Sequence, residues 1–155
     1  MEEKIMRKHV CESLLALSFL VSMLAAAAPA SAKSIDGLRA QIPFDFQVGD
    51  KLISAGDYAV TSMTSDGSGL RIRSTSGKES VITLTNMASG SANKKANPRL
   101  VFHKYGDQYF LAAVWGADQD GRELRESKRE RNLRKEMRVA QQAGAGVEVV
   151  TIEAR

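Results

Sequence analysis

Residues 99–115 (RLVFHKYGDQYFLAAVW) constrain the fold more than any other segment of the chain. Two largely apolar runs flank Gly106-Asp107, and the segment holds five of the eight aromatic residues that follow residue 32. Glycine at the first central position of a two-residue turn supplies the positive φ of a type II′ turn, which joins antiparallel strands. We therefore expect a β-hairpin at the centre of the core.

The turn also fixes which residues face each other across this hairpin. Both faces are apolar toward its base, which is typical of a central pair of strands covered on two sides. The expected pairs are Tyr105–Gln108, Lys104–Tyr109, His103–Phe110, Phe102–Leu111, Val101–Ala112 and Leu100–Ala113.

Most of the remaining chain is predicted to form short strands. Apolar and polar residues alternate over Leu38–Val48, which predicts one long strand with a bulge or a sheet edge at Pro43. Further strands are predicted at 57–61, 70–73, 80–84 and 147–153, with a polar surface loop at 87–97.

One late segment has the composition of a helix. No proline or glycine interrupts residues 122–143, which are rich in Arg, Glu, Lys and Leu. We predict a basic helix over about 121–143, with Asp120 as its N-cap. A thin apolar stripe around Met137 indicates that the second half packs on the sheet while the first half is solvated.

These elements predict a mainly β fold, an antiparallel sandwich or small barrel of about seven strands with one late helix and a C-terminal strand. We expect a single domain over 33–155, which is long enough for one core. The only cysteine is Cys11, so no disulfide can join parts of that domain and its stability must come from packing.

The first 32 residues have the three parts of a secretory signal peptide. Three basic residues within the first eight precede an apolar run at 14–28, and Ala30-Ser31-Ala32 offers small side chains to a signal peptidase. An uncleaved anchor is the alternative, but the run is shorter than the roughly 20 residues that span a bilayer. We therefore expect a secreted or periplasmic protein, exported by a Sec-type signal and cleaved near Ala32.

Candidate catalytic and metal-binding residues are few. His103 is the only histidine after residue 32, and hydrolytic or zinc chemistry would need further His, Cys or carboxylate groups converging on it. Asp118, Asp120 and Gly121 resemble the start of a calcium loop, but its twelfth position falls on Ser127, where a carboxylate is required. We expect no catalytic, cofactor-binding or metal-binding residue, and interpret His103 as a packed or half-exposed strand residue.

The excess of basic residues gathers in one segment, 122–138, which holds eight basic and four acidic side chains. Clustered cations gain affinity for polyanions by releasing counterions. However, Glu126, Glu130 and Glu136 interleave with them, and Glu130–Arg134 is the favourable i, i+4 pair of an ordinary solvated helix. Both interpretations stay open, and the candidate anion-binding residues are Arg125, Lys128, Arg129, Arg131, Arg134, Lys135 and Arg138.

Three sequence blocks resemble a group of small secreted bacterial proteins. They are IPFDFQVGDKLISAGDYAV at 42–60, RLVFHKYGDQYFLAAVW at 99–115 and GRELRESKRE at 121–130. The group shows PFxF-x-VGxxxLPAGxYxV, then a similar hairpin and a GREL helix start, so the resemblance implies export and one β-rich domain. It implies no catalytic residue. Ser54 stands where that pattern usually has proline.

The leading functional hypothesis is an exported, non-enzymatic β-domain that binds or scaffolds something at the cell envelope or in the extracellular space. An alternative is attachment to anionic lipid or polysaccharide surfaces through the basic helix, with another envelope protein as a further candidate partner. Nucleic acid is the least favoured partner of an exported chain, and we expect no cofactor and no transmembrane span after cleavage. A third hypothesis is a carrier of small apolar ligands, with a barrel mouth lined by Phe44, Phe46, Tyr58, Phe102 or Trp115.

Overall fold

The computed structural model describes residues 35, 37–89, 97–117, 121–140 and 147–155, which hold ten strands and one helix. The predicted signal peptide at 1–32 lies outside these residues, as does the centre of the predicted loop at 87–97. The elements are β1 (Leu38–Ile42), β2 (Phe46–Val48), β3 (Lys51–Ile53), β4 (Gly56–Ser62), β5 (Gly69–Ser74), β6 (Ser80–Met87), β7 (Arg99–Tyr105), β8 (Gln108–Trp115), β9 (Gly121–Leu124), α2 (Lys128–Ala140) and β10 (Glu148–Glu153).

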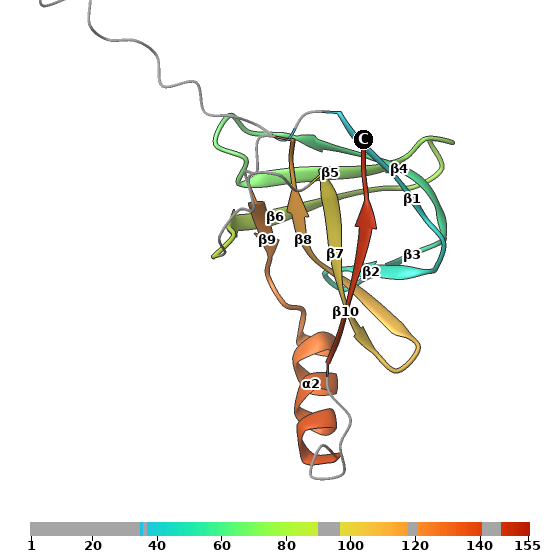
Figure 1. Cartoon of the computed structure of the whole chain (residues 1–155), viewed down its shortest axis with the longest axis vertical. Coiled ribbons are helices and arrows are strands. Elements are labelled where there is room, and N and C mark those ends of the chain that lie inside the picture. Colours follow the sequence, from blue (N-terminus) through green and yellow to red (C-terminus); the bar gives the residue numbers. More distant parts are fainter. Residues whose placement is uncertain (1–34, 36, 90–96, 118–120, 141–146) are drawn as a thin grey trace, which may run out of the picture. The chain divides into compact units, whose positions relative to one another are not determined.

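The strands form one continuous sheet that closes on itself. Neighbouring strands follow the order β1-β4-β5-β6-β9-β8, and β8 then pairs β7, which pairs β10 (Figure 1). Two backbone hydrogen bonds between Arg39 and Arg155, 2.8 and 2.9 Å long, join the residues after β10 back to β1. The predicted mainly β fold with one late helix is confirmed, with ten strands in the described residues instead of about seven.

The long strand predicted over Leu38–Val48 is wrong in one respect, because it is two strands. β1 pairs β4 antiparallel, whereas β2 pairs β3 and also β8, the latter in parallel. Pro43 has no N–H to give to a ladder, so pairing stops there. Asp45 then accepts a hydrogen bond of 2.8 Å from the Ala55 amide, and the chain leaves β4 and joins β8.

β7 and β8 form the predicted hairpin, with Gly106 at φ +59° in its turn. The expected register holds for the four pairs nearest the turn. Beyond them a bulge shifts the register, so that Val101 faces Ala113 instead of Ala112, and the pair expected at Leu100 is displaced in the same way. Alternation of apolar residues does not reveal a bulge, which is why those two predicted pairs are wrong.

Aromatic rings from three parts of the chain fill the space between the strands. Phe46, Tyr58 and Phe102 are at most 2% exposed. Their rings meet edge to face, with the centroid of Phe46 5.3 Å from that of Tyr58 and 5.5 Å from that of Phe102. Rings packed in this way leave little room for a ligand, so the interior gives the predicted apolar-ligand carrier no support.

The helix begins later than the sequence suggested. Residues 121–124 form β9, which pairs β6 and β8, and α2 starts at Lys128. Gly121 lies against the ring of Trp115, where an added Cβ would come within 2.6 Å of a ring carbon. Glycine is therefore needed at this position for close approach in a strand. The predicted N-cap, Asp120, lies outside the described residues, and the prediction is wrong because α2 begins at Lys128 and is capped by Ser127.

Only the start of α2 is buried, and the helix extends away from the strands (Figure 1). Ser127 is 7% and Glu130 4% exposed, whereas Val139 near the other end is 80% exposed. The prediction that the second half of the helix packs on the sheet is therefore wrong, because the contact that holds the helix is polar and lies in its first turn. Within the described residues, no helix is long and apolar enough to cross a membrane.

Candidate functional site at the start of α2

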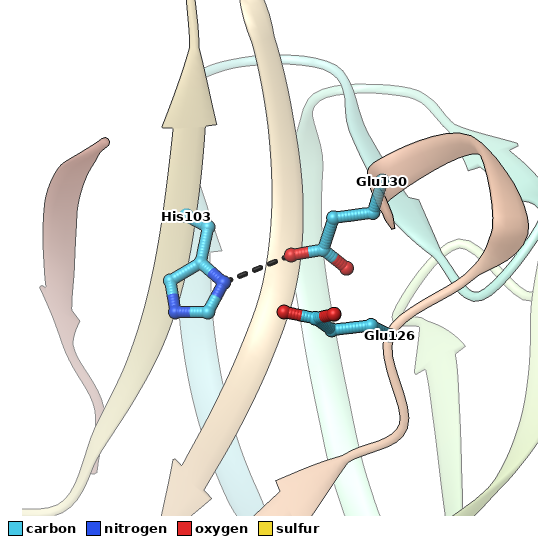
Figure 2. A group of neighbouring side chains, drawn as sticks. All are labelled: His103, Glu126 and Glu130. Carbon is cyan, nitrogen blue, oxygen red and sulfur yellow. Dashed lines mark hydrogen bonds and ion pairs between the residues drawn. The ribbon is translucent and has the colours of Figure 1, made fainter. Parts of the chain in front are cut away.

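Three titratable side chains from separate parts of the sequence meet at the start of α2 (Figure 2). His103 comes from β7, Glu126 from the segment before α2 and Glu130 from the first turn of α2. His103 Nδ1 lies 2.8 Å from Glu130 Oε1. Both carboxylates point toward the imidazole, and the ligand atoms of all three residues lie within 4.8 Å of one another.

The capping of α2 places Glu130 in this cluster. Ser127 Oγ accepts a hydrogen bond of 3.0 Å from the Glu130 backbone N–H, one of the amides that a helix start leaves unpaired. Ser127 and Glu130 have the spacing of a capping box, but the glutamate side chain bonds His103 instead of returning to the cap. This hydrogen bond joins the helix start to β7.

Glu126 is held by a different partner. Arg134 Nη1 donates to Glu126 Oε1 at 2.6 Å, which links the segment before α2 to its second turn. Because Arg134 bonds Glu126 and Glu130 bonds His103, the i, i+4 pair predicted between Glu130 and Arg134 is wrong. Two of the three carboxylates that interleave with the basic residues are thus engaged at the base of the helix.

The carboxylates raise the pKa of His103 above its ordinary value. The hydrogen bond to Glu130 is the largest cause, and the charges of Glu126 and Glu123 act in the same direction, against burial, which lowers the pKa. Burial raises the pKa of the Tyr105 hydroxyl to about 12, and Glu130 and Glu126 add to this effect. The cluster therefore favours a positive charge on the imidazole.

A pocket of about 340 Å³ opens beside the cluster. His103 and three carboxylates line it, together with the guanidinium groups of Arg125 and Arg131. Carboxylates and an imidazole at this spacing can bind a proton or a metal cation, and the pocket gives either one access from solvent.

Six of the seven predicted anion-binding residues are exposed. The exception is Arg134, which is half-buried beside Glu126. Arg129 also has a partner, because it donates to Gln108 Oε1 at 2.8 Å. Four exposed residues recur three or four positions apart and so share one face of the helix. This cationic stripe consists of Lys128, Arg131, Lys135 and Arg138.

The partnership of His103 with Glu126 and Glu130 was not foreseen from the sequence. Ser127 followed three residues later by Glu130 was an available signal for the helix start. Nothing in the spacing indicates β7 as the neighbour of that helix start, because the neighbour depends on the order of the strands. The predicted absence of catalytic and cofactor residues stays a prediction.

Comparison with known proteins does not extend this description. No protein-family model matches the chain, and no curated protein and no solved structure matches it. The functional interpretation therefore rests on the residues and their geometry.

Proposed function

We propose that the chain is an exported, non-enzymatic β-domain that attaches to anionic lipid or polysaccharide surfaces of the cell envelope or extracellular space through α2. The observation that carries this proposal is the cationic stripe. Its four residues are exposed on one face of a helix whose second half projects beyond its buried first turn. A row of four cations on one face suits an extended anionic surface better than a small anion.

The engagement of the carboxylates strengthens this proposal. The interleaved acidic residues are the main argument against anion binding, because they would neutralise the helix surface. Glu130 is only 4% exposed and bonds His103, and Glu126 bonds Arg134. Glu136 is exposed, but it lies about 120° around the helix from the middle of the stripe at 100° per residue. The stripe is therefore not neutralised by its own helix.

Export determines the class of partner in this proposal. The apolar run at 14–28 and the Ala30-Ser31-Ala32 motif support a signal peptide, and the resemblance of three sequence blocks to small secreted bacterial proteins agrees with it. An exported chain meets lipid headgroups and acidic polysaccharides more often than nucleic acid. Another acidic envelope protein would use the same charges.

The proposal that the chain is not an enzyme rests on the small number of histidine and cysteine side chains that could act as bases or nucleophiles. The sequence has no cysteine after Cys11 and one histidine after residue 32. That histidine is bonded through Nδ1 to Glu130 and so connects β7 with α2. A general base needs a nucleophile or a substrate proton within hydrogen-bond reach, and here the nearest group to Nδ1 is a carboxylate.

The test is co-sedimentation of the exported chain with vesicles of phosphatidylcholine that contain phosphatidylglycerol. We expect binding that weakens steeply between about 50 mM and about 150 mM salt, because exposed charges are screened over a shorter distance. The double variant Arg131→Gln/Lys135→Gln should bind about thirtyfold more weakly, since each cation near an anionic surface contributes about 1 kcal/mol.

The matched control is Arg73→Gln/Lys78→Gln, which removes the same charge from exposed positions on the β5–β6 hairpin. It should bind like the wild type. Glutamine has nearly the helix propensity of arginine and lysine, so the helix itself should persist in the first variant. Equal weakening in both variants would show a general charge effect, and binding that ignores salt would exclude the stripe as the attachment site.

A further inference from the structure

We propose that His103, Glu126 and Glu130 form a binding site for one divalent transition-metal ion of the zinc type, at the junction of β7 and α2. This inference goes beyond the attachment of α2 to anionic surfaces and does not depend on it. The sequence predicts no metal site because it lacks a second histidine or cysteine. The fold supplies two carboxylates in their place, from either side of the helix cap (Figure 2).

The ligand types suit zinc. Zn²⁺ binds imidazole nitrogen and carboxylate oxygen, and sites with three protein ligands keep a further position open for water or another group. One neutral imidazole and two carboxylates carry a charge that balances a divalent ion. The pocket of about 340 Å³ beside the three residues leaves space for the open position.

The spacing of the ligand atoms is close to that of a coordination sphere. Bonds of about 2.0 to 2.1 Å in a tetrahedral zinc site place two ligand atoms roughly 3.3 Å apart. His103 Nδ1 and Glu130 Oε1 are 2.8 Å apart, so an ion that replaces their shared proton needs only a small separation of the pair. All three ligand atoms lie within 4.8 Å, so the side chain of Glu126 must move inward by about 1 to 2 Å.

Glu126 can make this movement more easily than the other two residues. Its side chain is 26% exposed and lies just before the helix, whereas Glu130 is fixed in the first turn. Arg134 bonds one oxygen of the Glu126 carboxylate, which leaves the other oxygen for the ion. The positive charges nearby repel a divalent cation and so lower the affinity of the site for zinc; they belong to Arg125, Arg131 and Arg134. Protons compete with zinc for the imidazole and the two carboxylates.

The competing interpretation is that the cluster only anchors α2 through a proton shared by His103 and Glu130. The two interpretations differ in what happens when metal is added. An anchor without a metal site leaves the imidazole signal of His103 unchanged, whereas coordination through Nδ1 changes its chemical shift and releases a proton.

The experiment is a titration of the exported chain with ZnCl₂ in a buffer that does not bind metals, followed by calorimetry and by NMR of the imidazole. His103 is the only histidine after residue 32, so one imidazole signal reports the site. We expect one ion per chain, with an affinity that falls at acidic pH, because the imidazole must lose its proton before it can bind the ion. MgCl₂ should not compete, because Mg²⁺ prefers six oxygen ligands and retains its waters.

Two variants and one control test the assignment. His103→Gln should weaken zinc binding by about 100-fold or more. Loss of a residue that only supports a ligand costs up to about 100-fold, and loss of a direct ligand should cost at least as much. Glu126→Gln should weaken it by at least about tenfold while it leaves the His103–Glu130 anchor intact, which guards against simple unfolding. Glu136→Gln changes an exposed carboxylate of the same helix and should bind like the wild type.

The proposal is overturned if zinc leaves the His103 signal in place, or if Glu126→Gln binds zinc as tightly as Glu136→Gln does. The two proposals can fail separately, because the vesicle test substitutes Arg131 and Lys135 and the zinc test substitutes other residues. A chain that binds zinc but not vesicles would contradict only the proposed attachment function.

Discussion

One hydrogen bond at the start of α2 joins a half-exposed histidine to a nearly buried carboxylate. The side chains of His103 and Glu130 are 30% and 6% exposed, respectively. An ionised carboxylate at such a depth is costly unless a partner compensates for its lost hydration. His103 supplies that partner, and the pair becomes strongest when the imidazole is protonated.

The first prediction concerns the pH dependence of this pair in metal-free buffer. The folded-state pKa of His103 is raised by Glu130 above the ordinary value of about 6.5. Its contribution to the free energy of unfolding is therefore complete below about pH 6.5 and is lost as the pH rises through the folded-state pKa. We expect the urea midpoint of the wild type to fall over that range.

Glu130→Gln removes the charge and keeps the shape of the side chain. This variant should lower the pKa of His103 in an NMR titration and flatten the pH dependence of the urea midpoint. Glu148→Gln, which loses the exposed partner of Lys104, is the control and should leave the His103 titration unchanged. An unshifted His103 pKa in Glu130→Gln would show that the hydrogen bond does not control the titration.

At the scale of elements, α2 is a short helix that is fixed at one end. The cap at Ser127, the His103–Glu130 pair and the bond from Arg129 to Gln108 all lie in or before its first turn. The last turn has no comparable burial, since Val139 is 80% exposed. Isolated helices of this length are marginal in water, so these contacts decide whether α2 forms.

The second prediction tests the cap. Ser127→Ala removes the hydroxyl that accepts the Glu130 N–H and should lower the free energy of unfolding by about 1 kcal/mol. It should also reduce the helical signal in circular dichroism, because the helix loses its fixed end. Ser127→Thr keeps the hydroxyl and should recover most of the helical signal. An unchanged helical signal in Ser127→Ala would mean that the side-chain contacts alone maintain the helix start.

The strands were more predictable than the helix, for a physical reason. Alternation over Leu38–Ile42 and the glycine at Gly106 report local backbone geometry, so they located β1 and the turn of the central hairpin. Pro43 indicated an interruption locally, but the change of partner from β4 to β8 that follows it depends on the fold, as does the bulge that shifts Val101 by one residue. The His103 cluster could not be predicted from local sequence patterns for the same reason, since only the strand order brings β7 to the start of α2.

At the scale of the whole molecule, the described strands form a closed sheet, and α2 lies outside it. Closure depends on two hydrogen bonds between Arg39 and Arg155, and it leaves the buried aromatic rings between the strands as the core. The edge of β1 is thereby paired with another part of the chain and is not open to pairing with a second molecule. The proposed binding surface on α2 can then vary without disturbing the core, because no described residue of α2 belongs to the buried core cluster.

Hydrogen–deuterium exchange of residues 33–155, with and without phosphatidylglycerol vesicles, tests most directly whether a closed β-domain binds through its helix. Without vesicles we expect β7 and β8 to exchange slowest and the second half of α2 to exchange quickly, because the slowest amides lie in the buried core. With vesicles, new protection should appear in α2 alone. Protection that appears on the strands, or a chain that exchanges quickly throughout, would contradict a closed β-domain that binds through its helix.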